Sequence, residues 1–452
     1  MKLSQRILLT VLSGGIATFA FPPFACWPLA FLAWPLLFLA VRGSGFRVGT
    51  RLGVLHGLVL YGLTLSWFWN IFQTMAIALW TLLALFTGLA AGLAGWTSQR
   101  WPAAKWLPIF AAVSWSCVEY YRCEWFWLRF PWITPGIALG PTWLSPIIGA
   151  YGAGFFVILA AAYLAGNTKR QRLVGAVLAL ALATFGTFRP SPVKEVGSGI
   201  PVLAVQSENL DLTTYRERTE QSGFRSGIAL WPEYAAPFFI REGPDDLGKL
   251  RTLAKSQDLT IVFGTQQRAT GGKHFNEALT LDGDGILGSH FKNRPVPFMD
   301  DGQPGTSAIP VVTRYGTLGT PICFDCDYAE VIRRMTTGGV EVFTVPSLDA
   351  TRWSRRQHLQ HSEFFRHRAL ENGRWFAVCA ASGMTQIIDP HGNRIATIPL
   401  LEDGILRGTV YPRRELTFYT RFGWLTPWIL TVMAVSWTAW LIAIRRREIT
   451  RA

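Results

Sequence analysis

The chain has 452 residues, of which 50% are hydrophobic and only 16% are charged, whereas an ordinary soluble domain has roughly 25% charged residues. The formal net charge is +14, but the Lys and Arg stand in short clusters between apolar runs, a pattern typical of membrane topology and not of nucleic-acid binding. Almost all the acids fall in the region 190–420. The composition predicts a membrane domain, a soluble domain and a closing membrane anchor.

Eight apolar segments are candidates for membrane spans, because a bilayer core of about 30 Å needs roughly 20 apolar residues per helix. Lys2 and Arg6 precede the first segment, as in a signal peptide. The apolar character continues beyond it, so we expect a span that is retained in the mature protein. The predicted spans are 7–23, 25–41, 52–71, 75–96, 106–122, 145–166, 171–188 and 424–444.

Five basic clusters flank these segments. With eight spans, all five fall on the same side of the membrane, and the positive-inside rule makes that side the cytoplasm. We therefore expect the region 190–420 to lie outside the cytoplasm. The clusters are Lys2 and Arg6; Arg42, Arg47 and Arg51; Arg100 and Lys105; Lys169, Arg170 and Arg172; and Arg445, Arg446, Arg447 and Arg451.

Glu119 and Arg122 lie three residues apart at the end of a predicted span. Charges in or near the membrane are often functional. A structural ion pair that orients the loop 123–144 is the other interpretation, and the sequence leaves both open.

The soluble middle begins after a predicted break at Arg189-Pro190-Ser191-Pro192. Short apolar runs then alternate with polar helical stretches, which predicts a layered α/β domain. The predicted helices are 244–256, 327–337 and 354–372. The predicted strands are 201–206, 227–231, 259–264, 275–291, 308–313, 317–322, 341–346, 375–380 and 384–388.

Three reactive side chains follow predicted strands in this domain: Glu233, Lys292 and Cys323. A cysteine thiolate can attack a carbonyl and hold the acyl group as a thioester. Glu233 is suited to take the thiol proton, and Lys292 to stabilise the thiolate and the developing oxyanion. Each motif is weak alone, because a cysteine after a strand is usually a small buried hydrophobe. The ordered set of three favours acyl chemistry.

The order Glu, Lys, Cys resembles the nitrilase superfamily, and nearly the whole chain is similar to the apolipoprotein N-acyltransferase family. The membrane region carries the narrower resemblance. Its motifs are Phe21-Pro22-Pro23-Phe24-Ala25-Cys26-Trp27-Pro28-Leu29-Ala30, Leu65-Ser66-Trp67, Glu119-Tyr120-Tyr121-Arg122, Phe130-Pro131-Trp132 and Gly149-Ala150-Tyr151-Gly152.

The resemblance implies a multi-span α-helical membrane domain plus an α/β nitrilase-like α-β-β-α sandwich domain. Residues 1–190 would form the membrane domain with about seven transmembrane helices, residues 198–415 the catalytic domain, and residues 422–452 a transmembrane helix with a basic cytoplasmic tail. It also implies that Glu233 is the general base, Lys292 the oxyanion cation and Cys323 the nucleophile.

The implied reaction is ping-pong acyl transfer in a bacterial inner (plasma) membrane, with a multi-pass, monomeric enzyme whose catalytic domain is periplasmic or otherwise extracytoplasmic. A phospholipid would acylate Cys323, and the α-amino group of a diacylglyceryl-cysteine at a lipoprotein N-terminus would take the acyl chain. No metal or cofactor and no nucleic acid is expected. The alternatives are a related membrane acyltransferase or amidase with a different acceptor, and a non-enzymatic transporter or scaffold.

Some positions differ from the family pattern and mark a divergent member. Met299-Asp300 stands where the family has Gly-Glu, and Phe324-Asp325 where it has Tyr-Glu. We expect Asp300, Phe324 and Asp325 to support the site.

Two further interpretations concern residues near the catalytic motifs. Trp231, Phe298 and Trp353 are candidates for a lid or for substrate contact, since apolar loops suit a lipid-handling enzyme. Cys323 and Cys326 form a C-x-x-C, for which redox pairing is the less favoured interpretation because it leaves the Glu and Lys motifs unexplained.

Overall fold

The computed structural model describes residues 1–187, 191–193, 195 and 197–451. The chain forms two compact units: a helical unit (Met1–Arg189 and Phe422–Ala452) and a sandwich unit (Pro190–Arg421). Arg189 and Pro190 of the predicted break, and residue 188 at the end of a predicted span, lie outside the described residues.

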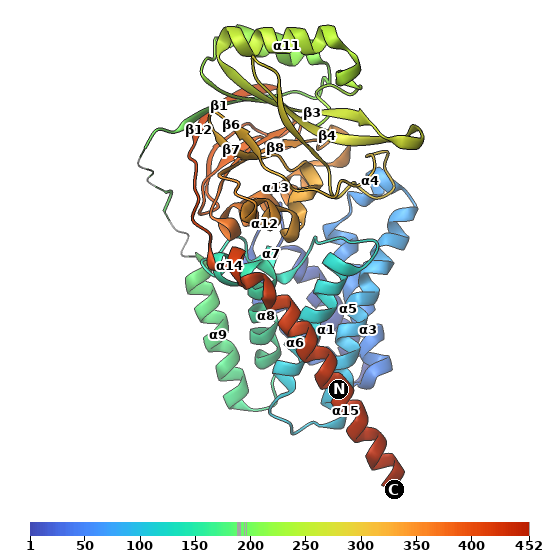
Figure 1. Cartoon of the computed structure of the whole chain (residues 1–452). Helices are drawn as coiled ribbons and strands as arrows, with labels where there is room; N and C mark the ends of the chain where they lie inside the picture. Colours follow the sequence, from blue (N-terminus) through green and yellow to red (C-terminus); the bar gives the residue numbers. More distant parts are fainter. Residues whose placement is uncertain (188–190, 194, 196, 452) are drawn as a thin grey trace. The chain divides into compact units, whose positions relative to one another are not determined.

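The helical unit has a helix at each of the eight predicted spans, and Figure 1 shows these helices as coiled ribbons. Among the described residues, Met75–Arg100, Ser145–Leu164 and Gly423–Glu448 are long and apolar enough to cross a membrane, and Trp27–Val41 is a shorter apolar helix. The number of spans stays a prediction. The α-helices are α1 (Leu3–Thr18), α2 (Ala30–Val41), α3 (Gly45–Thr64), α4 (Phe68–Phe72), α5 (Met75–Arg100), α6 (Leu107–Tyr120), α7 (Pro135–Ala138), α8 (Ser145–Leu164), α9 (Lys169–Thr187) and α15 (Thr426–Arg451).

Small residues let α3 and α5 pack backbone against backbone. A Cβ on Gly53 would lie 2.5 Å from Cβ of Ala91, and a Cβ on Gly57 would lie 2.6 Å from Cα of Ala84. Apolar side chains gain little by leaving lipid, so close van der Waals packing of this kind is what joins helices in a membrane.

Arg122 holds the loop that follows α6. Its guanidinium donates to O of Phe130 at 2.8 Å and to O of Trp132 at 3.2 Å, while Glu119 accepts from Nε1 of Trp115. These contacts favour the structural interpretation, in which Arg122 orients the loop 123–144.

The sandwich unit contains two six-stranded sheets. The strand order is β12-β1-β2-β3-β4-β5 in the first sheet and β11-β10-β9-β8-β7-β6 in the second. The strands are β1 (Ile200–Gln206), β2 (Gly227–Leu230), β3 (Leu259–Arg268), β4 (His274–Leu281), β5 (Ile286–Phe291), β6 (Val311–Thr313), β7 (Gly316–Gly319), β8 (Val342–Ser347), β9 (Trp375–Ala380), β10 (Gln386–Ile388), β11 (Arg394–Thr397) and β12 (Gly404–Val410). The helices are α10 (Leu212–Gln221), α11 (Pro244–Gln257), α12 (Ala329–Thr337), α13 (Arg355–Asn372) and α14 (Phe418–Arg421).

Two apolar cores lie between the layers of helices and sheets. One lies between the sheets, where Val202 and Leu230 of the first meet Val342 and Ala377 of the second. The other joins the first sheet to α10 and α11. Figure 1 shows α11 on one side of the sheets, and α12 and α13 on the other. The predicted α-β-β-α sandwich is confirmed.

The details differ from the sequence prediction in several places. The predicted strand 275–291 is a hairpin of β4 and β5, which turns at Asp282–Gly285. Helix α10 and strands β11 and β12 were not predicted. Strand β12 pairs antiparallel with β1 along its length, from Ile200↔Val410 to Gln206↔Gly404.

The α3–α5 contact gives a direct test. We expect Gly53→Val to lower the thermal unfolding midpoint of the detergent-solubilised protein, because overpacking costs about 1–3 kcal/mol. Gly62→Val is the matched control, because Gly62 lies on the same helix and a Cβ there would meet nothing within 4 Å. Equal effects of the two changes would contradict the close packing.

Candidate active site

The three predicted reactive residues follow strands of the sandwich unit. Glu233 follows β2, Lys292 comes directly after β5, and Cys323 begins a short 3-10 helix (Cys323–Asp327) after β7. The Glu233 turn packs against β3 at Gly264, where a Cβ would lie 2.4 Å from Cα of Glu233. A larger residue at 264 would therefore displace the carboxylate.

The Lys292 ammonium lies between two carboxylates. Its Nζ is 2.7 Å from Oε1 of Glu233 and 2.7 Å from Oδ2 of Asp301, and all three side chains are buried. Nδ2 of Asn276 donates to the same Oε1 at 2.6 Å and to Oδ1 of Asp301 at 2.7 Å. Three ionisable groups therefore share one enclosed network, and one carboxylate can hold a proton without leaving Lys292 unpaired.

Asp301, and not the predicted Asp300, is the supporting carboxylate of this network. Asp301 also accepts from N of Val296 at 2.7 Å and from the hydroxyl of Tyr234 at 3.1 Å. The side chain of Asp300 is 95% exposed, and its nearest ionic neighbour is His274 at 3.9 Å. The turn after Val296 turns the second of two adjacent aspartates inward, and the residue pattern alone does not reveal which one.

Burial and charge set the protonation of the network in opposite directions. Burial raises the pKa of Glu233, against the pull of Lys292. Burial works against the charge on Lys292, but Asp301 and Glu233 outweigh it and hold the pKa of the ammonium well above its ordinary value. Glu233 is therefore a carboxylate that can accept a proton, and Lys292 stays cationic.

Cys323 is held in a strained turn beside this network. Its φ is +47°, a left-handed conformation that costs a non-glycine residue about 1–2 kcal/mol. The residue is 3% exposed, and its thiol donates to O of Leu348 at 3.7 Å. Burial raises the pKa of the thiol, Glu233 raises it further, and Lys292 lowers it. The thiol thus lies within electrostatic reach of both groups and needs a base to become a thiolate.

Asp325 supports the backbone on both sides of Cys323. It is fully buried and accepts from N of Ile322 at 3.1 Å, from N of Arg294 at 2.8 Å and from Nε2 of His290 at 2.9 Å. Its partners connect the Cys323 turn to the Lys292 strand. Phe324, the other expected supporting residue, packs its ring edge-on against Tyr328, with centroids 5.2 Å apart.

A second buried ionic group lies behind the Leu348 carbonyl and was missed from the sequence. Nδ1 of His361 is 2.8 Å from Asp349, and Nε2 is 3.3 Å from Asp327. Burial opposes the charge on His361, but the two carboxylates raise its pKa to about 10. His361 therefore stays protonated at neutral pH and fixes the loop that receives the Cys323 thiol. The sequence carries no local signal for this group, because Asp349 and Asp327 lie in segments other than α13.

The structure separates the three lid candidates. Trp231 is fully buried, donates to Thr219 at 3.0 Å and stacks on Tyr215, so it belongs to the core and not to a lid. Phe298 is 63% exposed. Trp353 is partly exposed at the end of a 3-10 turn. Only Phe298 and Trp353 remain candidates.

Cys326, the second cysteine of the C-x-x-C, is fully buried, and all six cysteines are free thiols. The structure therefore contains no Cys323–Cys326 disulfide, and the less favoured redox interpretation gains no support.

The two adjacent aspartates can be distinguished by stability. We expect Asp301→Asn to destabilise the protein by about 3 kcal/mol, because it removes one partner of a buried charge. Asp300→Asn should change stability by less than about 0.5 kcal/mol, since that side chain faces solvent. Thermal unfolding of the full chain measures both, and a larger effect at Asp300 would contradict the network.

The His361 group predicts a pH dependence. The unfolded state loses the histidine proton near pH 6.5, whereas the folded state keeps it to about pH 10. The contribution of protonated His361 to the free energy of unfolding is therefore complete below about pH 6.5 and declines as pH rises towards 10.

We expect His361→Gln to flatten this decline in unfolding midpoints measured at pH 6, 8 and 10. His391→Gln is the control, because among the described residues the hydrogen bond found for the His391 side chain is with O of Ser191, and it has no carboxylate partner. An unchanged slope in the His361 variant would refute the assignment.

Comparison with known families covers both units. The family model described as apolipoprotein N-acyltransferase N-terminal domain matches residues 13–163, and the carbon-nitrogen hydrolase family model matches residues 217–414. Among solved structures, Saccharomyces cerevisiae Nit3, a member of the nitrilase superfamily, is 21% identical and covers 49% of this chain and 93% of its own, with a TM-score of 0.40.

Curated relatives extend over nearly the full length. The apolipoprotein N-acyltransferase of Azotobacter vinelandii is 28% identical over 98% of this chain and 95% of its own. That of Pseudomonas syringae pv. tomato is 28% identical over 97% of each chain. With both parts matched in the same order, the chain combines an apolipoprotein N-acyltransferase N-terminal domain with a carbon-nitrogen hydrolase domain, and it is similar over nearly its full length to proteins named apolipoprotein N-acyltransferase.

Proposed function

We propose that this protein transfers an acyl chain from a phospholipid to the α-amino group of a diacylglyceryl-cysteine at the N-terminus of a lipoprotein, through a thioester on Cys323. The observation that carries the proposal is the Cys323 thiol within electrostatic reach of a buried Glu233–Lys292 pair. The names of the full-length relatives support acylation of lipoproteins.

The first half-reaction acylates the cysteine. Among the described residues, both hydrogen bonds to Glu233 reach Oε1, so Oε2 is left to take the thiol proton. The sulfur then attacks the ester carbonyl carbon. Two of the three N–H groups of Lys292 point to Glu233 and Asp301, and the third can stabilise the oxyanion, a contribution of about 3 kcal/mol. The C–O bond breaks, and Glu233 returns the proton to the departing lysophospholipid alkoxide.

The second half-reaction passes the acyl chain to the amine. The amine nitrogen attacks the thioester carbonyl, again with the oxyanion beside Lys292. Glu233 takes a proton from the nitrogen, the C–S bond breaks, and the proton restores the thiol of Cys323. The same base thus serves both steps, which requires a carboxylate whose pKa is raised above its ordinary range.

We also propose that the helical unit is a multi-pass inner-membrane anchor, with the sandwich unit outside the cytoplasm and the protein acting as a monomer. The five basic clusters support this orientation by the positive-inside rule. A periplasmic position would give the site access to lipoprotein N-termini.

A second candidate keeps the thioester and changes the acceptor to water or to another amine. The match of residues 217–414 to the carbon-nitrogen hydrolase family favours it. An acyl-enzyme attacked by water would release a free fatty acid.

The nucleophile is tested by replacing it. We expect Cys323→Ala to reduce lipoprotein acylation at least about 10³-fold and to abolish the thioester adduct seen by mass spectrometry of the intact protein. Cys326→Ala is the matched control and should stay within a few-fold of wild type. Acylation by the Cys323 variant at wild-type rate would overturn the proposal.

The acceptor is tested in a strain depleted of its own apolipoprotein N-acyltransferase. Rescue of growth with triacylated lipoproteins supports the lipoprotein acceptor. Release of free fatty acid from phospholipid without rescue would assign the second candidate instead.

A further inference from the structure

One end of the helical unit is strongly basic. The five clusters described above hold fourteen Lys and Arg, and the one acid among them, Glu448, pairs with Arg100. Hydrogen bonds tie these helix ends together: N of Gly43 donates to Ser98 at 2.9 Å, and Nδ2 of Asn167 donates to O of Pro102 at 3.0 Å. The charges are thus gathered at one end of one bundle.

A cavity of about 60 Å³ opens at this end, among residues of α2, α5, α6 and α8 and the start of α9. Since a water needs at least about 10–15 Å³ of such space, the cavity can hold several waters or a group the size of a phosphate. Its floor is apolar and buried, and includes Phe38, Ala94 and Ala162.

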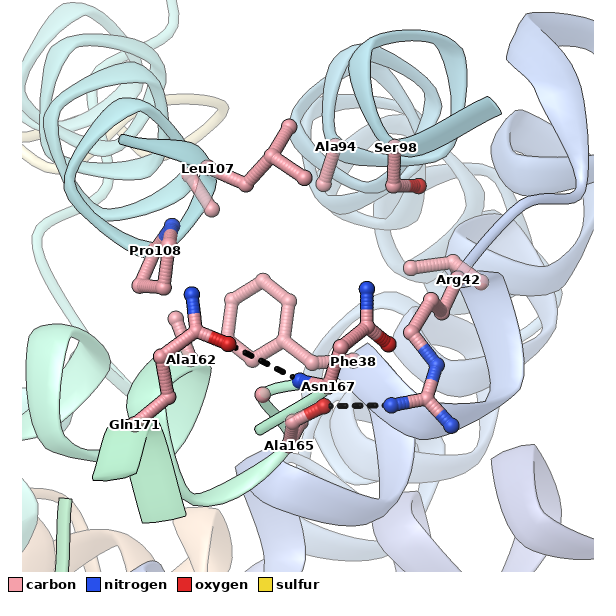
Figure 2. A pocket seen from close by; sticks show the side chains of 13 residues that line it. Phe38, Arg42, Ala94, Ser98, Leu107, Pro108, Ala162, Ala165, Asn167 and Gln171 are labelled. Atoms are coloured by element: carbon pink, nitrogen blue, oxygen red, sulfur yellow. Dashed lines mark hydrogen bonds between the residues drawn. The ribbon is translucent and has the colours of Figure 1, made fainter. Parts of the chain in front are cut away.

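The rim of the cavity is polar (Figure 2), with Arg42 and Asn167 exposed and Gln171 half-buried. Arg42, Asn167 and Gln171 surround the opening. Among the described residues, O of Ala165 is the one acceptor found for the Arg42 guanidinium, at 2.9 Å, although arginine has five N–H donors. Capping the end of α8 therefore occupies only part of Arg42 and leaves donors for a ligand.

The charge around the opening selects the ligand. Lys169, Arg170 and Arg172 follow the rim residue Asn167 within one helical turn and a half, with no acid nearby in the sequence. Arginine donates to phosphate oxygens in a bidentate fork, and basic pockets between membrane helices bind anionic lipid headgroups. A cationic ligand would be repelled by the same charges.

We propose that this cavity binds the headgroup phosphate of an anionic phospholipid from the leaflet at the basic end, with Arg42 as the main contact. The apolar floor receives the adjoining part of the lipid, and the headgroup lies at the rim. The proposal rests on the proposed membrane position of the helical unit. This lipid is bound as a stabilising ligand and is separate from the chemistry at Cys323, so failure of the acyl transfer test leaves it standing.

The test uses the full-length protein in a neutral detergent, with dioleoyl phosphatidylglycerol as the probe and the thermal unfolding midpoint as the readout. A ligand that binds the folded state raises the midpoint with saturation. We expect phosphatidylglycerol to do so and phosphatidylcholine not to. Arg42→Gln should raise the half-saturating concentration about tenfold, the effect of roughly 1.4 kcal/mol.

Arg47→Gln is the matched control, because Arg47 belongs to the same basic end, is exposed and does not line the cavity. It should change the half-saturating concentration by less than about twofold. Equal weakening by both variants would show diffuse attraction and overturn the site. A response to inorganic phosphate equal to that of the lipid would assign the cavity to free phosphate and also overturn it.

Ala162→Leu tests the cavity without changing charge. The larger side chain fills the floor, so the lipid response should be lost while the midpoint without lipid reports whether the variant folds. A folded Ala162→Leu variant with a full lipid response would contradict binding in this cavity.

Discussion

A buried ammonium needs compensating charge, and in the sandwich unit the Lys292 ammonium obtains it from Glu233 and Asp301. Leaving such a charge unpaired would cost several kcal/mol, so the segments that carry the partners must be in place together. Glu233 comes from the end of β2, Asn276 from β4 and Asp301 from the turn after β5. The constraint that stabilises the fold here is also the one that places the titratable groups of the candidate site.

Sequence patterns predicted much of this arrangement, and their failures have physical causes. The sandwich and most strands follow from apolar runs. Strand β12 was not predicted because it is an edge strand with alternating burial and two glycines. Helix α10 was not predicted because most of its residues are polar, although Asp211 caps it by accepting from N of Thr214. The periodicity of hydrophobic residues identifies elements that are well buried, but it gives a weak signal for the edge strands of a sheet.

The site shows the same division. Glu233, Lys292 and Cys323 each follow a strand, which sequence order reveals. Asp301 was missed in favour of Asp300, because the inward direction depends on the turn that follows Val296. The buried His361 was not assigned to the site, because its partners Asp349 and Asp327 lie in other segments. Long-range pairing decides these roles, and single-sequence reasoning has no access to it.

The pairing of β1 with β12 has a consequence for how such a protein is assembled. The chain enters the sandwich at Ile200 and leaves it at Val410, and these two residues face each other across one ladder. The sandwich unit is thus inserted between two parts of the helical unit, and its two ends lie side by side. A domain whose ends are close together can be inserted into a surface connection of another domain without disturbing the fold of either.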